Sequence, residues 1–284
     1  MKSSHKLNWK PYWLDAARSL KRAVLSRRVV ELVGEEYTLA YEARLLREAP
    51  DYRLLKQCAR DKACVFDIGA NVGTTALVMS SSMAAEGILY AFEASESSCL
   101  TIRENALLNG VHQKIHVINA LLAEESGQVK DYHWDFVSGR ASMLMQPPSG
   151  SSIPLQKATL RLDDFVEGSR VRPDFLKIDV EGAENQVLAG TQRTLRSVRP
   201  LVYVELHAWP GTPVSQNVET ILAQLAATDY RMLWLRTQEF VTSGEVFASL
   251  REAAGGVESR TRVLLIPSEA GPPAWLSSFD TIKL

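Results

Sequence analysis

A glycine-rich turn between an apolar run and a helical pattern constrains this chain more than any other feature. Residues 63–68 form an apolar run typical of a buried strand, and the periodicity of a helix begins at Thr74. Gly69, Asn71 and Gly73 lie between them. Glycine has no Cβ and asparagine tolerates a positive φ, so a ligand can approach this backbone closely. The free N–H groups of the following helix favour an anionic group, and the stretch therefore predicts a nucleotide-like cofactor site.

The next predicted strand, residues 88–92, is followed by Glu93. An acid at the end of the second strand is where a doubly wound sheet binds ribose hydroxyls. The turn has the spacing Gly69-x-x-x-Gly73, which departs from the G-x-G-x-x-G pattern of dinucleotide sites. We therefore expect S-adenosylmethionine, which has no pyrophosphate, in preference to a dinucleotide.

Four motifs occur in a fixed order within residues 60–210. They are Asp-Ile-Gly-Ala-Asn-Val-Gly at 67–73, Tyr-Ala-Phe-Glu at 90–93, Leu-Asp-Asp-Phe at 162–165 and Phe-Leu-Lys-Ile-Asp-Val-Glu-Gly at 175–182. In this order the chain resembles the FkbM family of S-adenosylmethionine-dependent methyltransferases, although Ala94 stands where that family usually has proline. The resemblance implies O-methylation of a hydroxyl on a sugar or secondary metabolite.

The resemblance implies an α/β fold, the Rossmann-like seven-stranded sheet of a class I methyltransferase with helices on both faces. The alternation of strand and helix patterns independently predicts a mostly parallel sheet that ends in a C-terminal antiparallel hairpin. We expect strands over residues 63–68, 88–92, 114–119, 174–180, 200–207, 230–236 and 262–266. Helices are expected over residues 73–85, 95–109, 183–196 and 214–227.

Two further segments have less regular patterns. An aromatic hairpin is expected over residues 129–136 and 141–145, and a hairpin with a short helix over residues 237–261. Asp163 or Asp164 is predicted to cap the helix that begins beside them.

The first 60 residues are expected to form a helical extension, and residues 61–284 the methyltransferase domain. Residues 1–30 carry eight lysines and arginines against one acidic residue, Asp15, and apolar residues recur at helical spacing over 7–33. Two short helices are expected within 38–60. The extension would act as a lid, an acceptor contact or a homodimer contact, or would lie on a membrane surface. Its basic side lacks interleaved aromatic residues, so we expect no nucleic-acid partner.

The cysteines bear on location. Cys58, Cys64 and Cys99 are an odd number without paired spacing, which argues against a disulfide framework. We find no apolar run near the roughly 18 residues of a membrane-spanning helix and no signal-peptide pattern. A cytoplasmic protein without a transmembrane segment is the expectation.

Four ionisable side chains lie at the ends of the fourth and fifth predicted strands: Asp179, Glu181, Glu205 and His207. Side chains two residues apart share one side of a strand, so these groups can converge. His207 is our first choice of general base, because its ordinary pKa of about 6.5 suits proton abstraction near neutrality. Asp179 would orient His207 or bind the small-molecule or glycosylated acceptor. Glu181 would join in catalysis or interact with the start of the following helix.

A runner-up mechanism uses a divalent metal bound by Asp179, Glu205 and His207, which would lower the pKa of the acceptor hydroxyl. We do not favour it, because imidazole suits Mg²⁺ poorly.

The cofactor residues expected are Asp67, Gly69, Ala70, Asn71, Gly73, Glu93, Asn119, Ala120 and Asp179. Asp67 would order the turn or bind the cofactor's amino group. The resemblance, not the spacing, suggests that Asn119 or Ala120 lies beside the adenine ring.

Two rival functions remain. One is an NAD(P)-dependent oxidoreductase on a similar sheet, which the asparagine in the turn and the lack of a Tyr-x-x-x-Lys pair near the fourth and fifth strands disfavour. The other is a non-catalytic binding module that docks a carrier protein through the basic helix.

Overall fold

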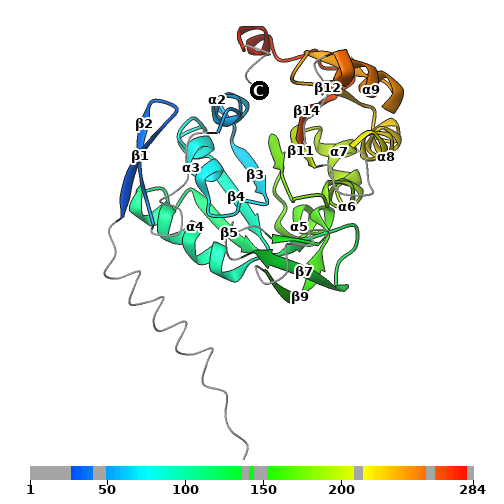
Figure 1. The fold of residues 1–284 in the computed structure, drawn as a ribbon. Coiled ribbons are helices and arrows are strands. Elements are labelled where there is room, and N and C mark those ends of the chain that lie inside the picture. The colour runs from blue at the N-terminus through cyan, green and yellow to red at the C-terminus, as the bar shows by residue number, and fades with distance from the viewer. Residues whose placement is uncertain are drawn as a thin grey trace, which may run out of the picture.

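A central eight-stranded sheet organises the molecule (Figure 1). The computed structural model describes residues 27–40, 49–135, 141–143, 152–207, 214–253 and 260–279. Across the sheet the order is β13 (Glu239–Val241), β12 (Tyr230–Trp234), β14 (Arg260–Pro267), β11 (Leu201–His207), β10 (Phe175–Ile178), β3 (Cys64–Ile68), β4 (Ile88–Glu93) and β5 (Ile115–Asn119).

The strand directions confirm the predicted fold class. β11, β10, β3, β4 and β5 pair in parallel, whereas β14 runs antiparallel to both of its neighbours, β11 and β12. All seven predicted strands are present, and β13 adds an eighth at the edge from the segment where a hairpin was expected. β10 is buried throughout, as is usual for a parallel strand covered on both faces.

Helices cover both faces of the sheet (Figure 1). They are α2 (Tyr52–Cys58), α3 (Thr74–Ser80), α4 (Glu96–Leu108), α5 (Leu162–Ser169), α6 (Glu184–Ala189), α7 (Gln192–Val198), α8 (Val214–Ala226) and α9 (Gly244–Ala253), with a 3₁₀ turn, η2 (Ala274–Ser278). Alternate side chains of β3 enter two separate cores: Val65 packs with residues of α2, α3 and α4, and Phe66 with residues of α5 to α9.

The single helix expected over residues 183–196 is instead two helices, α6 and α7, which are separated at Gly190. A Cβ on Gly190 would lie 2.3 Å from the carbonyl oxygen of Ala123, so this point of the chain packs directly against another backbone segment. The expected short helix within 237–261 is α9.

The helical prediction is wrong for residues 28–33 and 38–39. These residues belong to an antiparallel hairpin, β1 (Arg28–Leu32) and β2 (Glu35–Leu39), joined at Val33 and Gly34, which both have positive φ. Val30 and Leu32 are buried at alternate positions, a period of two that the helical pattern of the preceding residues had obscured. Residues 1–26 and 41–48 lie outside the described residues, and with them most of the predicted extension and its lid or dimer role.

The hairpin is attached to α4 through two asparagine side chains. The backbone N–H of Thr38 donates to Asn109 Oδ1 (2.9 Å), and that of Ala40 to Asn105 Oδ1 (2.8 Å). Asn105 is fully buried, and its Nδ2 donates to the carbonyl of Val72 (2.7 Å) in the turn after β3. One amide therefore joins the N-terminal hairpin to that turn.

A second, smaller sheet has the order β6 (Leu121–Leu122), β9 (Ser152–Leu160), β7 (Val129–Asp135) and β8 (Ala141–Ser142). The antiparallel pairing of β7 with β8 confirms the expected hairpin. β9 was not expected as a long strand.

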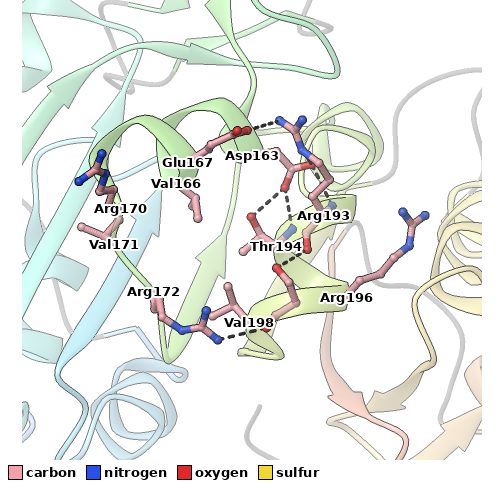
Figure 2. A pocket seen from close by; sticks show the side chains of 11 residues that line it. Asp163, Val166, Glu167, Arg170, Val171, Arg172, Arg193, Thr194, Arg196 and Val198 are labelled. Atoms are coloured by element: carbon pink, nitrogen blue, oxygen red, sulfur yellow. Dashed lines mark hydrogen bonds and ion pairs between the residues drawn. The ribbon is translucent and has the colours of Figure 1, made fainter.

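Asp163 caps a different helix from the one predicted (Figure 2). The N-cap of α5 is Arg161, whose side chain makes no capping bond. Asp163 is buried, and its carboxylate accepts from the backbone N–H groups of Arg193 and Thr194 (2.9 and 2.8 Å) and from the Thr194 hydroxyl (2.8 Å). It thus accepts hydrogen bonds from free N–H groups in the first turn of α7, although Arg193 lies 30 residues further along the chain.

We expect Asp163→Ala to lower the free energy of unfolding by about 2–3 kcal/mol, because it leaves buried donors of α7 without an acceptor. Its neighbour Asp164 is exposed and paired with Arg193, so Asp164→Ala should cost less than about 1 kcal/mol. Urea unfolding followed by circular dichroism measures both. Equal losses in the two variants would contradict the assignment of Asp163 as the cap of α7.

Candidate functional site

The turn after β3 has the backbone conformation that its glycines suggested. φ is +76° at Gly69, +52° at Asn71 and +84° at Gly73. A Cβ on Gly69 would lie 1.8 Å from the carbonyl oxygen of Asp179, so the chain leaving β10 passes directly against the turn. Only glycine fits at position 69, and the turn is held between the ends of β3 and β10.

A buried lysine lies beneath this turn. Lys177 Nζ donates to the carbonyl of Gly69 (3.0 Å) and forms ion pairs with Asp67 Oδ1 (3.2 Å) and Asp179 Oδ2 (3.5 Å). Burial alone would lower the pKa of Lys177, but the carboxylates of Asp67 and Asp179 outweigh it, so its pKa is raised and the ammonium stays charged. Lys177 was not among the residues expected at the site, and its only signal in the sequence is a lone charge within an apolar strand.

Asp67 is fully buried, and its carboxylate contacts other side chains of the protein. Besides Lys177 it contacts Thr75, whose hydroxyl donates to Asp67 Oδ2 (2.6 Å). Of the two roles expected for Asp67, ordering the turn is the one that these contacts match.

Glu93 holds the same turn from the end of β4. Its Oε2 accepts from the backbone N–H of Asn71 (2.9 Å) and its Oε1 from that of Ser95 (2.8 Å). Burial raises the pKa of Glu93 to about 7, against the lowering effect of these two hydrogen bonds. Each carboxylate oxygen can accept a second hydrogen bond, so Glu93 retains capacity for a ligand hydroxyl.

A narrow cavity lies at the carboxyl ends of β3 and β4. It measures about 40 Å³ and is lined by Ile68, Gly69, Phe92, Glu93, Ala94, Ala120, Leu121, Leu122, Met143, Val180 and Ala183. Ala120 faces the cavity. Asn119 instead donates from Nδ2 to the carbonyls of Glu93 (3.0 Å) and Ala94 (3.1 Å), which fixes the corner between β4 and β5.

Asp179, Glu181 and His207 come together beside the turn. His207 Nε2 lies 3.4 Å from Glu181 Oε2 and 3.8 Å from Asp179 Oδ1. Asp179 and Glu181 were expected to converge because they share one side of a strand. Instead, β10 ends at Ile178 and neither acid belongs to a strand. The positive φ of Glu181 (+52°), followed by Gly182 (+106°), turns the chain at this point.

Glu184, which the sequence analysis missed, holds His207 from the other side. Its Oε1 is 2.9 Å from His207 Nδ1 and also accepts from the backbone N–H of Gly182 (2.9 Å). Glu184 is 1% exposed, at the first turn of α6. Nothing in the local sequence indicates that this acid points inward toward a residue 23 positions away.

The pKa of His207 differs from the ordinary value on which its choice as a general base rested. Burial alone would lower it, but the hydrogen bond to Glu184 and the charges of Asp179 and Glu181 raise the pKa to about 9. The ring therefore carries a proton at neutral pH when these three carboxylates are its only partners.

Glu205 is paired with two arginines and lies outside this cluster. Its Oε1 lies 3.5 Å from nitrogens of both Arg260 and Arg262, on the neighbouring strand β14. In the part of the chain that the structure describes, the group with metal-ligand spacing is Asp179, Glu181 and His207, and one ligand atom of each lies within 4.8 Å of the others. Glu205, a member of the predicted metal set, does not belong to it.

A second, larger groove lies between α5 and α7, and Figure 2 shows the side chains that line it. Its volume is about 670 Å³. It is lined by Asp163, Val166, Glu167, Arg170, Val171, Arg172, Arg193, Thr194, Arg196, Ser197 and Val198. Arg172 and Val198 precede β10 and β11, whereas ligands of open α/β sheets bind where strands end. None of the residues predicted for the site lines this groove. Of the helices described, none is both long enough and apolar enough to cross a membrane.

Known proteins that are similar in sequence to this chain are methyltransferases. The family model described as the methyltransferase FkbM domain matches residues 67–232. Hexuronic acid methyltransferase AglP of Haloferax volcanii is 26% identical over 203 residues, which cover 71% of this chain and 80% of that protein.

Solved structures show more distant similarity. The methyltransferase FkbM of Methylobacillus flagellatus is 14% identical with a TM-score of 0.45, and the match covers 80% of this chain but only 46% of that one. The O-methyltransferase TomG of Streptomyces achromogenes, solved with S-adenosylmethionine, is 13% identical with a TM-score of 0.45, over 79% of this chain and 82% of that one.

We expect Lys177→Met to lower the free energy of unfolding by about 3–5 kcal/mol, because it leaves the buried carboxylate of Asp67 without a counter-charge. Lys130→Met is the matched control, since Lys130 pairs with Glu124 at the surface and should matter by at most about 1 kcal/mol. Adding Asp67→Asn to Lys177→Met should recover part of the loss. Chemical denaturation compares the four proteins, and a loss no larger than that of Lys130→Met would contradict this account.

Proposed function

Because the chain belongs to the FkbM methyltransferase family, we propose that it transfers the methyl group of S-adenosylmethionine to a hydroxyl of a sugar or secondary metabolite. The observation that carries the proposal is the turn at Gly69, which is fixed by Lys177 from below and by Glu93 from the side. It lies next to a cluster of two carboxylates and an imidazole. A cofactor site and an acceptor site are then neighbours, as transfer between two bound molecules requires.

The residues of the turn suit the proposed cofactor. Gly69, Ala70, Asn71 and Gly73 present a backbone that a nucleoside can approach closely, and a Cβ on Gly69 would collide with protein. The remaining lone pairs of Glu93 would accept from the ribose hydroxyls, and Ala120 would lie beside the adenine ring. S-adenosylmethionine supplies an electrophilic methyl group, so the protein needs mainly to position the two reactants.

The acceptor side is assigned to Asp179, Glu181 and His207. A hydroxyl is a poor nucleophile at neutral pH, and its proton must leave as the methyl group arrives. These three side chains lie within reach of one another and remain partly open to solvent through Asp179, whose side chain is 26% exposed. We assign activation of the hydroxyl to the cluster as a unit, with Glu184 orienting His207. The similarity to a hexuronic acid methyltransferase supports a sugar-related acceptor.

Isothermal titration with S-adenosylhomocysteine tests the cofactor assignment. We expect the full chain to bind. Glu93→Gln should bind at least about tenfold more weakly, because it lacks the charged carboxylate whose oxygens accept from the two ribose hydroxyls. Glu96→Gln, an exposed neighbour in the first turn of α4, should bind like the wild type. Because burial raises the pKa of Glu93 to about 7 and the hydroxyls favour the ionised carboxylate, wild-type affinity should increase from pH 6 to pH 8. Glu93→Gln should lack that increase.

No binding by folded protein at millimolar S-adenosylhomocysteine would contradict the proposal. Binding of NADH in its place would favour the oxidoreductase alternative, and binding of neither would favour a non-catalytic module.

Methyl transfer itself is tested with labelled S-adenosylmethionine and a panel of sugar acceptors that includes hexuronic acid glycosides. We expect label in a methyl ether, which resists mild alkali because it has no carbonyl carbon for hydroxide to attack. Label that mild alkali releases would mark a methyl ester and would contradict transfer to a hydroxyl.

A further inference from the structure

We propose that Asp179, Glu181 and His207 bind a divalent transition-metal ion. The catalytic role of this ion rests on the proposed function, whereas binding of the ion can be measured without any methyl transfer. The three side chains approach from two different segments, the chain after β10 and the end of β11.

The spacing of the ligand atoms fits a common metal ion. One atom from each residue lies within 4.8 Å of the other two, and His207 Nε2 is 3.4 Å from Glu181 Oε2. Metal bonds of about 2.0–2.2 Å place neighbouring ligand atoms roughly 3–3.5 Å apart. Asp179 Oδ1 lies 3.8 Å from Nε2, a few tenths of an ångström beyond that spacing.

The ring nitrogen Nε2 of His207 points to a ligand independently of the spacing. His207 is 4% exposed, and its buried Nε2 has no hydrogen-bond partner although it faces the two carboxylates. The other nitrogen, Nδ1, is engaged by Glu184, which is itself held by the backbone N–H of Gly182. A carboxylate bonded to the far nitrogen is the usual arrangement around a histidine that binds a metal, because it fixes the ring and its tautomer.

The local charge also favours a dication. Three carboxylates, Asp179, Glu181 and Glu184, surround one imidazole, and the cation nearest to Asp179 is Lys177, which it shares with Asp67. The side chains of Asp179 and Glu181 are 26% and 13% exposed, so an ion can enter from solvent. Three protein ligands leave coordination positions open for an oxygen of the acceptor.

The ligand set selects the class of metal. Imidazole nitrogen suits Zn²⁺ and other transition metals, and carboxylates suit Mn²⁺ as well, so a site with one nitrogen and two oxygens favours Mn²⁺ or Zn²⁺ over Mg²⁺. Glu205 is not a ligand in this proposal, because its carboxylate is paired with Arg260 and Arg262.

At such a site the ion lowers the pKa of an acceptor hydroxyl at its open position. The hydroxyl proton is released to solvent, and the new C–O bond forms as the C–S bond of the sulfonium breaks. The products are the methylated acceptor, S-adenosylhomocysteine and a proton.

Titration of the full chain, freed of metal with EDTA, tests the site. Mn²⁺ binding is followed by electron paramagnetic resonance and Zn²⁺ binding by calorimetry. We expect one ion per chain and at least tenfold weaker binding of Mg²⁺. His207→Ala and Glu181→Gln should each weaken Mn²⁺ binding at least tenfold. His116→Ala, which removes an exposed histidine of β5, and Glu205→Gln should change it less than threefold.

Thermal melting shows whether each variant is folded. If His207→Ala does not fold, Glu181→Gln still tests the site. The proposal is overturned if the folded wild type binds neither ion at 1 mM, or if His207→Ala or Glu181→Gln binds Mn²⁺ as tightly as the wild type. S-adenosylhomocysteine binding in the same samples separates the two proposals. Cofactor binding without metal binding overturns only the metal site, and metal binding without cofactor binding overturns only the proposed function.

Discussion

The Lys177 ammonium links the turn after β3 to the chain that leaves β10. It bonds to the carbonyl of Gly69 and forms ion pairs with Asp67 at the end of β3 and Asp179 after β10. A buried ammonium is stable only with such partners, so the positions of the turn and of Asp179 depend on each other. A substitution at Asp179 therefore affects the turn at Gly69 through one shared cation, Lys177.

The elements that the sequence predicted well are those whose signals are local. The buried strand before Gly69, the positive φ of Asn71 and the chain of β/α units each depend on residues within a few positions of one another. The N-terminal hairpin was mistaken for helix because the helical spacing upstream was extended through Val30 and Leu32, whose burial follows a period of two. A short strand next to a strongly periodic segment gives too few positions for its own period to stand out.

What the sequence could not supply is the partner of each buried charge. Glu184 and His207 are 23 residues apart, Asp163 and Thr194 are 31 apart, and Lys177 reaches a carbonyl 108 residues away. The ordinary pKa of histidine was a poor guide for the same reason, because three carboxylates from another segment raise the pKa of His207 to about 9. Charges that are brought together by tertiary folding leave no periodic trace in the chain.

The amide of Asn105 gives the hairpin a role beyond its own packing. That side chain accepts from Ala40 on one side and donates to Val72 on the other, and it is completely enclosed. The family model matches from residue 67, yet the backbone N–H that completes this amide's hydrogen bonding, that of Ala40, lies 27 residues upstream. A fragment that begins at residue 67 would thus carry an unsatisfied amide oxygen on Asn105, next to the turn after β3. The folded unit therefore begins upstream of the segment that the family model matches.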